Sequence, residues 1–258
     1  MEHLPKWADV VLIPVLSLLT AFLISGGVIL AIGGDPIEAI KVMVDGALGS
    51  SYGWGYTLYY TTSFIFSGLA VTVAYHAAQF IIGGEGQAQL GGLGVALVCL
   101  ALPWPHWTVA LLAASLGAAL FGAAWAAIPA WLQARFGSHI VITTIMFNYV
   151  AASVMIYFLS DVLRPVGQSD PASARFPVGA KLPSLHDVPI LGALFDARTP
   201  ANISFFIAVI ACFGVWLLLF RSKLGYEIRA FGKSESAAIY AGISPTKVIM
   251  VSMLISGA

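Results

Sequence analysis

The chain is dominated by apolar runs of the length that crosses a lipid bilayer. A transmembrane helix needs roughly 20 mainly apolar residues. Only 9% of the 258 residues are charged, against roughly 25% in soluble domains. The predicted spans are 10–32, 57–79, 84–102, 108–132, 140–160 and 201–220. We therefore predict an all-α polytopic membrane protein, in which residues 1–258 form one transmembrane helical bundle.

A seventh apolar run begins near Val248, and the sequence stops at Ala258. About 11 residues rise roughly 16 Å in a helix, whereas the hydrocarbon core is about 30 Å thick. From the sequence we expect a C-terminally incomplete domain that cannot transport by itself. The first run, 10–32, is too long for a signal-peptide core and is expected to be a retained span.

Basic residues indicate the orientation of the spans, because cytoplasmic segments carry an excess of Lys and Arg. With the N-terminus inside, the inner segments hold seven of the twelve, starting with Lys6, and five of these fall within 221–247. No basic residue occurs between Lys41 and Arg135. Only the counting of spans therefore places the turn near residue 80 on the inner side.

Two segments are predicted to lie outside. Residues 34–50 carry apolar side chains at helical spacing, with Asp35 as N-cap and Pro36 at the first helical position. We expect a short amphipathic helix on the outer surface, with an ordinary loop as the alternative. Residues 163–200 contain six prolines, which predicts a periplasmic loop that covers the outer mouth.

A glycine-rich break interrupts the apolar stretch near residue 83. Gly83, Gly84 and Gly86 permit backbone conformations forbidden to other residues, and broken helices often form transporter binding sites. Glu85 is the only acid between Asp45 and Asp161, so we predict that it lines a translocation path. The alternative places Glu85 in the first turn of the next helix, where the helix dipole favours it.

Two polar residues share a face of the span 140–160. Thr144 and Asn148 are four residues apart, and a buried amide must be hydrogen-bonded. Asn148 bonds either a neighbouring helix, water or a solute. In the span 108–132, small residues at Ala114, Gly117 and Gly122 predict a face for close helix packing.

Several classes of chemistry lack support in the sequence. Cys99 and Cys212 lie in apolar runs without metal-ligand spacing and are interpreted as free thiols. The sequence contains no phosphate-binding loop of the Walker A type and no metal or catalytic constellation. The formal net charge is zero, which gives no indication of nucleic-acid binding.

Residues 221–247 form a polar, glycine-punctuated segment between two apolar runs. Small residues let a partner approach closely, and the charges keep the segment in water. The pattern resembles the cytoplasmic coupling loop of ABC-transporter permeases of the branched-chain amino acid and simple-sugar type, nearest to the nucleoside or simple-sugar subgroup. The resemblance implies that the ATPase-coupling residues are Gly225, Tyr226, Glu227, Arg229, Ala230, Gly232, Ala237, Ala238, Tyr240, Ala241 and Gly242, with a short helix around Ser234 to Tyr240.

Two further motifs resemble the same subgroup. The run from Phe80 to Gln87 matches Phe-Asn-Ile-Gly-Gly-Glu-Gly-Gln, with Ile81 in place of Asn. Residues 137–149 match Gly-x-x-Glu-Val-Ile-Thr-Thr-Ile-Met-Leu-Asn-Tyr, with Ile140 in place of Glu. From the break and the resemblance together, the predicted translocation path comprises Gly83, Gly84, Glu85, Gly86, Gln87, Thr144 and Asn148.

The resemblance implies a multi-pass permease subunit of an ATP-driven importer in a bacterial inner membrane. The expected solute is a nucleoside or simple sugar, ahead of a branched-chain amino acid. The expected partners are cytoplasmic ATPase subunits, a second permease subunit and an extracytoplasmic solute-binding protein. The chain itself would be no enzyme and hold no cofactor, with ATP bound by the partner. The alternative is a proton-coupled secondary transporter with Glu85 or His76 as its proton site.

Overall fold

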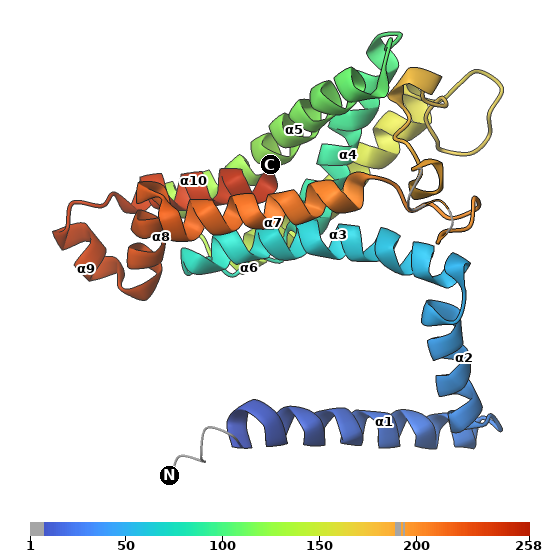
Figure 1. The fold of residues 1–258 in the computed structure, drawn as a ribbon. Coiled ribbons are helices and arrows are strands. Elements are labelled where there is room, and N and C mark those ends of the chain that lie inside the picture. The colour runs from blue at the N-terminus through green and yellow to red at the C-terminus, as the bar shows by residue number, and fades with distance from the viewer. Residues whose placement is uncertain (1–7, 189–191, 193) are drawn as a thin grey trace.

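A computed structural model describes residues 8–188, 192 and 194–258 (Figure 1). Lys6 and residues 189–191 and 193 of the predicted loop lie outside the described residues. The helices are α1 (Ile13–Ala31), α2 (Pro36–Leu48), α3 (Ser51–His76), α4 (Gly84–Ala101), α5 (Trp107–Phe136), α6 (Ile140–Tyr157), α7 (Ser204–Arg221), α8 (Lys223–Lys233), α9 (Glu235–Tyr240) and α10 (Pro245–Gly257). Within the described ranges no strand occurs, and the all-α prediction is confirmed.

Short non-α turns complete the secondary structure. A π-helical turn, Ala8–Leu12, precedes α1, and another, Phe158–Val162, extends α6. The predicted loop after it holds two 3-10 turns, Val178–Ala180 and Leu185–Asp187. An antiparallel bridge joins Ser184 to Asn202 near the end of that loop.

Five of the helices are long and apolar enough to cross a membrane: α1, α3, α5, α6 with its π-helical extension, and α7. The predicted span 84–102 is helical as α4, but it does not belong to this set, so the count of six spans stays a prediction. Helix α3 begins at Ser51 rather than at 57. The hydroxyl of Ser50 accepts the Gly53 N–H at 3.0 Å and caps the earlier start.

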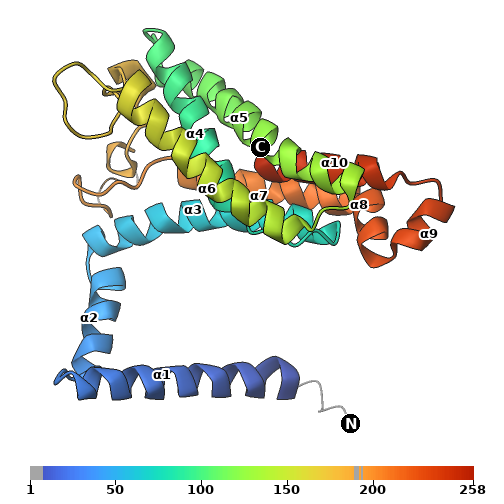
Figure 2. The ribbon, with the colours of Figure 1, turned by 180° about the vertical axis from the view of Figure 1, so that it is seen from behind.

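In the bundle, α3 packs against α7 and α10. Helix α10 also packs on α5, and α4 contacts both α5 and α6. In both ribbon views α1 stands apart from the bundle and is joined to it by α2, which runs crosswise between α1 and α3 (Figures 1 and 2). Helix α1 has no buried side chain, as expected of a helix surrounded by lipid.

Helix α2 begins where the sequence predicted. The Asp35 carboxylate accepts the N–H groups of Ile37 at 2.8 Å and Glu38 at 3.5 Å, and Pro36 is the first helical residue. This confirms the helix and its cap. Its position on the outer membrane surface stays a prediction.

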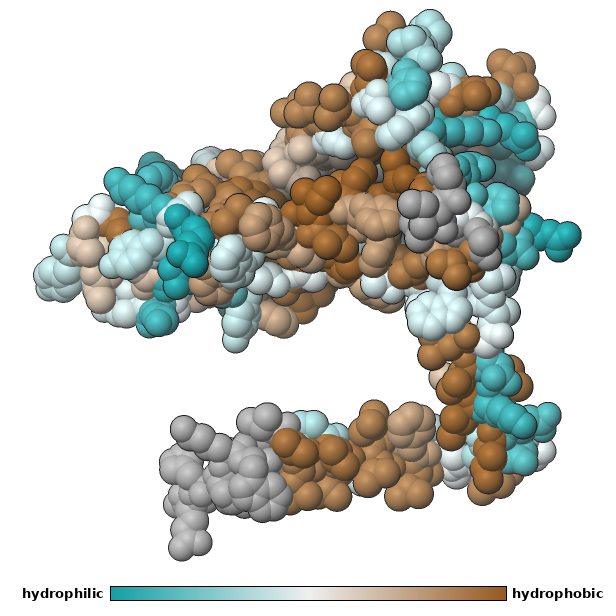
Figure 3. Space-filling view, in the orientation of Figure 1, coloured by the Kyte–Doolittle hydropathy of each residue, from teal (hydrophilic) through white to brown (hydrophobic). Residues whose placement is uncertain are grey.

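Polar residues gather at the two ends of the bundle, with an apolar band between them (Figure 3). One end, here called the α8–α9 end, also holds the turn near residue 80, because Gly232 lies against the backbone of His76 and Ala78. At the other end Gly179 of the loop meets Trp104, and Thr199 meets Gly55. The turn near residue 80 therefore lies at the same end as 221–247, as the span count predicted.

Close helix packing follows the small residues. A Cβ atom on Gly94 would lie 2.5 Å from the Gly117 carbonyl oxygen, so the backbones of α4 and α5 are in contact. A Cβ on Gly257 would lie 2.5 Å from the Gly122 oxygen, which brings α10 onto α5 in the same way. Ala114 is also buried. The predicted packing face of the span 108–132 is confirmed.

Candidate functional site

The chain between α3 and α4 is irregular, as the glycine run predicted. Helix α3 ends at His76, Ala78 adopts the left-handed region with φ 56°, and α4 begins at Gly84. Ile81 is buried, whereas Phe80 and Ile82 are exposed. The break is thus anchored in the core by one side chain and positions the first turn of α4.

Thr144 and Asn148 hold this break from α6. The Ile82 N–H donates to Thr144 Oγ1 at 3.2 Å, and Asn148 Nδ2 donates to the Ile82 oxygen at 2.7 Å. The Gly86 N–H donates to Asn148 Oδ1 at 3.0 Å. Gly83, the N-cap of α4, has no side chain to satisfy the free N–H groups of the first turn, so Asn148 caps α4 from another helix.

Two glycines of the break, Gly83 and Gly86, fit their positions for a reason other than the one the sequence indicated. Gly83 has an ordinary φ of −105°, and none of Gly83, Gly84 and Gly86 is among the described residues with positive φ. A Cβ on Gly83 would lie 3.0 Å from Thr144 Cβ, and one on Gly86 would lie 2.9 Å from Asn148 Oδ1. The explanation by backbone freedom was therefore wrong. Gly83 and Gly86 permit close approach to α6.

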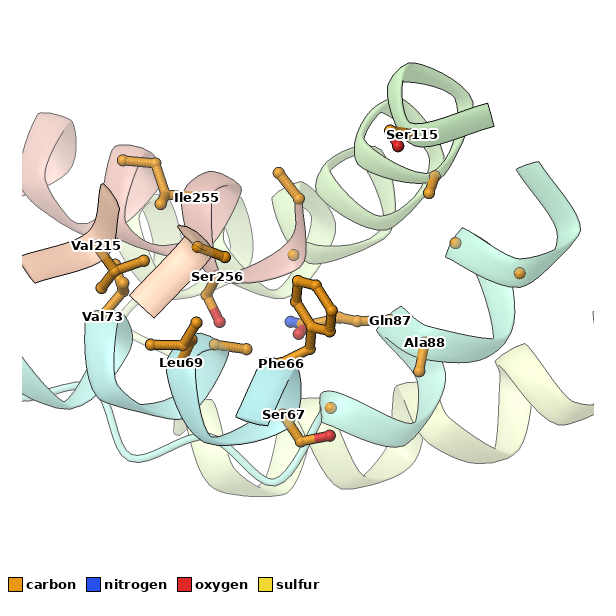
Figure 4. A pocket seen from close by; sticks show the side chains of 18 of the residues that line it. Phe66, Ser67, Leu69, Val73, Gln87, Ala88, Ser115, Val215, Ile255 and Ser256 are labelled. Atoms are coloured by element: carbon orange, nitrogen blue, oxygen red, sulfur yellow. The ribbon is translucent and has the colours of Figure 1, made fainter. Parts of the chain in front are cut away.

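A cavity of about 550 Å³ lies beside the break, bordered by α3, α4, α5, α7 and α10 (Figure 4). Its polar side chains are Ser67, Gln87, Ser115 and Ser256, and Phe66 adds an aromatic ring. Gln87 and Ser256 are only 6% and 5% exposed. Gln87 Oε1 and Ser256 Oγ have no hydrogen-bond partner among the described residues. Figure 4 shows both side chains turned toward the same space next to Phe66.

The cavity suits a small neutral molecule. Its volume falls within the range of about 300–1,000 Å³ that is usual for small-molecule sites. None of its lining side chains is charged, so an ion or zwitterion would lose water without gaining an ionic partner. The amide and the hydroxyl could each bond a polar edge, while the ring and aliphatic walls accept an apolar face.

Only some of the residues predicted for the translocation path line this cavity. Gly84 and Gln87 line it, whereas Gly83 and Gly86 pack against α6. Glu85 is exposed in the first turn of α4, where its carboxylate accepts a bond from Gln89 Nε2 at 3.4 Å. This is the position that the alternative interpretation gave to Glu85. Its role in a path stays a prediction.

Sequence reasoning missed Phe66 and Ser256. Each lies in an apolar run without a local pattern, and the cavity arises only when α3 and α10 meet α4. A serine in an apolar helix usually bonds its own helix backbone, so Ser256 gave no signal as a site residue.

The segment 221–247 is largely helical. Ser222 caps α8 by accepting the Gly225 N–H at 3.0 Å, and Ser234 caps α9 by accepting the Ala237 N–H at 3.3 Å. Helix α9 confirms the predicted short helix, and Gly242 follows it with φ 80°, in the left-handed region.

The eleven predicted coupling residues fall into two groups. The residues at the surface are Tyr226, Ala237, Tyr240, Ala241 and Gly242, and Tyr240 is 95% exposed. The others hold the segment together. Ala238 is 2% exposed, Gly225 is buried, Glu227 pairs with Lys247 at 3.0 Å, and Arg229 lies over the Phe220 ring at 5.0 Å. Ala230 and Gly232 are half-buried.

No group of His, Cys, Asp or Glu suited to hold a metal occurs in the described part of the chain. Cys99 is a buried free thiol and Cys212 a half-buried one.

Comparison with known proteins gives a consistent result. The family model described as "branched-chain amino acid transport system / permease component" matches residues 54–258. A glucose ABC transporter permease protein (TsgB13) of Haloferax volcanii is 33% identical over 246 residues, 95% of this chain and 64% of its own length. A guanosine ABC transporter permease protein (NupP) of Bacillus subtilis is 34% identical over 248 residues, 96% of this chain and 68% of its own.

A nucleoside ABC transporter permease protein (NupB) of Lactococcus lactis is 32% identical over 252 residues, 96% of this chain and 68% of its own. The chain thus spans about two thirds of the length of these relatives. No solved structure matches. The extent of the family match, together with the apolar helices, establishes that this chain is an integral, multi-pass membrane protein of the branched-chain amino acid transport system permease-component family.

Proposed function

We propose that the chain is a membrane-spanning permease subunit of an ATP-driven ABC importer, and that its solute is a nucleoside or a simple sugar. The names of its relatives support the solute class, since they include glucose, guanosine and nucleoside permeases. The observation that carries the proposal is the cavity beside the break, whose lining side chains are uncharged and in which Gln87 Oε1 and Ser256 Oγ lack partners among the described residues.

The chemistry of the cavity favours these solutes over a branched-chain amino acid. A zwitterionic amino acid would need partners for both of its charges, and the lining side chains offer none. A nucleoside or sugar is neutral and brings hydroxyl and amine donors. Those donors match the free amide oxygen of Gln87 and the hydroxyl of Ser256.

Neither proton site of the alternative, a proton-coupled carrier, borders this cavity within the described residues. Glu85 is exposed on the neighbouring turn. His76 bonds the Thr72 carbonyl through Nδ1 at 2.8 Å, and its ring meets Phe220 edge-on at 5.8 Å. These contacts are those of a packing residue.

In the proposed transporter the α8–α9 end faces the cytoplasm and docks an ATPase subunit, which binds and hydrolyses ATP. The density of basic residues in 221–247 and the exposure of Tyr226 and Tyr240 support this docking end. A second permease subunit would lie beside the chain. An extracytoplasmic solute-binding protein would deliver solute at the opposite end, over the predicted periplasmic loop 163–200.

The test measures binding of radiolabelled guanosine and glucose to the purified full chain in lipid nanodiscs. Gln87→Leu and Ser256→Ala each remove one free polar group, worth about 0.5–1.5 kcal/mol, or roughly 2- to 12-fold in affinity. Glu85→Gln, two residues from Gln87 but outside the lining, is the matched control and should bind like wild type. Saturable binding that neither cavity variant weakens would contradict the proposed site. Weaker binding by Glu85→Gln would support the predicted role of Glu85 in the translocation path.

A further inference from the structure

A second cavity, of about 470 Å³, lies at the α8–α9 end. It is bordered by the turn after α3, the turn between α5 and α6, and the junction of α8 with α9. Its polar side chains are Gln79, Gln133, Ser138, Lys233, Ser234 and Glu235. Three elements that are far apart in sequence thus converge on one polar pocket, which the proposed solute path does not include.

Three buried atoms in this pocket lack partners. Gln79 Oε1, Gln133 Oε1 and Ser138 Oγ are hydrogen-bonded to none of the described residues. Gln79 is only 5% exposed, and its Nε2 donates to the Ala77 carbonyl at 3.3 Å, so Oε1 is the atom left for another group. Buried polar atoms are nearly always satisfied in native proteins. The three atoms are therefore free to bind a group that enters the pocket from outside.

A group that binds the two free amide oxygens must donate hydrogen bonds. Both amide oxygens only accept, and the carboxylate of Glu235 at the rim also accepts. A phosphate or carboxylate would find oxygen facing oxygen. Lys233 borders the pocket as well, but it is exposed and Glu235 offsets its charge. The buried acceptors therefore determine that the pocket prefers a hydrogen-bond donor to an anion. An arginine guanidinium, with five N–H donors and no acceptor, fits this set.

We propose that this pocket receives an arginine side chain of the cytoplasmic ATPase subunit. The inference rests on the proposed function, because it takes the α8–α9 end as the docking end. Beside the pocket, α9 exposes Ile239 and Tyr240, which are 52% and 95% exposed. An exposed tyrosine next to a pocket for arginine is typical of the energetically dominant part of protein interfaces.

A docking role and a purely structural role predict effects of different size on stability. In the chain alone, Gln79 Oε1 contributes no bond and Nε2 contributes only the long bond to the Ala77 carbonyl at 3.3 Å, so Gln79→Met should lower the melting temperature by no more than about 4 °C. In the complex, Gln79→Met removes a charge-assisted hydrogen bond to the arginine, so the affinity of the chain for the ATPase should fall at least tenfold. Gln168→Met, in the loop at the opposite end, is the matched control for the same exchange of side chains.

The experiment uses the full chain in nanodiscs and the ATPase subunit of its own transporter. It measures the binding affinity, the melting temperature of the chain alone, and modification of the ATPase by phenylglyoxal, which reacts with arginine. We expect wild type and Gln168→Met to protect one ATPase arginine, and Gln79→Met to bind weakly without protecting it.

Three results would overturn the inference: wild-type affinity for Gln79→Met, a melting temperature lowered by more than about 4 °C along with the lost affinity, or no protected arginine. Ala237→Trp, which adds bulk to the exposed face of α9, separates this failure from that of the proposed function. If Ala237→Trp blocks binding and Gln79→Met does not, the assignment of the α8–α9 end as the docking end is supported and the proposed arginine pocket is contradicted. If Ala237→Trp binds like wild type, the docking end itself is contradicted.

Discussion

Replacing Asn148 by leucine should loosen the junction between α3 and α4. The Asn148 amide uses both of its ends, accepting from the Gly86 N–H at 3.0 Å and donating to the Ile82 oxygen at 2.7 Å. Leucine has similar volume but bonds neither group. Because Gly86 is buried in the first turn of α4, its N–H would be left without a partner.

The expected loss in the free energy of unfolding follows from these contacts. A hydrogen bond between side chain and helix in a membrane protein averages about 0.6 kcal/mol, so the two bonds together contribute about 1.2 kcal/mol. An unsatisfied buried N–H costs a further ~1–3 kcal/mol. The sum is about 2–4 kcal/mol. Leucine is also the better helix former, by less than about 0.7 kcal/mol, so the measured loss is a lower bound.

The assay is equilibrium unfolding of the full chain in detergent micelles. Thr144→Val removes the acceptor of the Ile82 N–H, and with it the bond that Oγ1 donates to the Val141 carbonyl of its own helix at 3.1 Å; it should cost about 1 kcal/mol. Ser153→Ala is the control on the same helix, because the exposed Ser153 hydroxyl bonds only its own helix at 3.0 Å, and it should stay within about 0.5 kcal/mol of wild type. If Asn148→Leu also stays within about 0.5 kcal/mol, the capping role is refuted.

Two further substitutions test close backbone contacts. Gly94→Ala should destabilise the chain by ~1–3 kcal/mol, because its Cβ would lie 2.5 Å from the Gly117 oxygen. Gly68→Ala is the control: its Cβ would have nothing within 4 Å, so it should stabilise the chain by up to about 1 kcal/mol. Equal effects of the two substitutions in thermal unfolding would contradict the packing argument. In Gly232→Ala the new Cβ would lie 3.1 Å from the Ala78 nitrogen. This substitution should lower the number of solute molecules imported per ATP hydrolysed by the reconstituted transporter. An unchanged ratio would count against a coupling role for this contact.

Features governed by local chemistry could be predicted from the sequence. The apolar runs predicted helices because a backbone in lipid must satisfy its own hydrogen bonds. Asp35 predicted the start of α2 because a cap acts within three residues. The starts of α3 and α8 were missed although Ser50 and Ser222 cap them, since span prediction weighs hydropathy over capping.

Features governed by tertiary contact could not be predicted. The spacing of Thr144 and Asn148 placed them on one face but did not name Ile82 and Gly86 as their partners. The cavity beside Gln87 needs Ser256, which is distant in sequence and has no motif around it. Sequence likewise could not separate the buried Ala238 from its exposed neighbours, because the α8–α9 segment is covered by other helices on one side only.

A series of contacts joins the proposed docking end to the proposed solute cavity. Gly232 at the end of α8 lies on the backbone of His76 and Ala78, where the break begins. The break is held by Asn148 and leads into α4, whose first turns place Gln87 in the cavity. Contacts between backbones deform less than contacts between long side chains. We therefore expect a shift of α8 on ATPase closure to move α4, and with it Gln87, as one body.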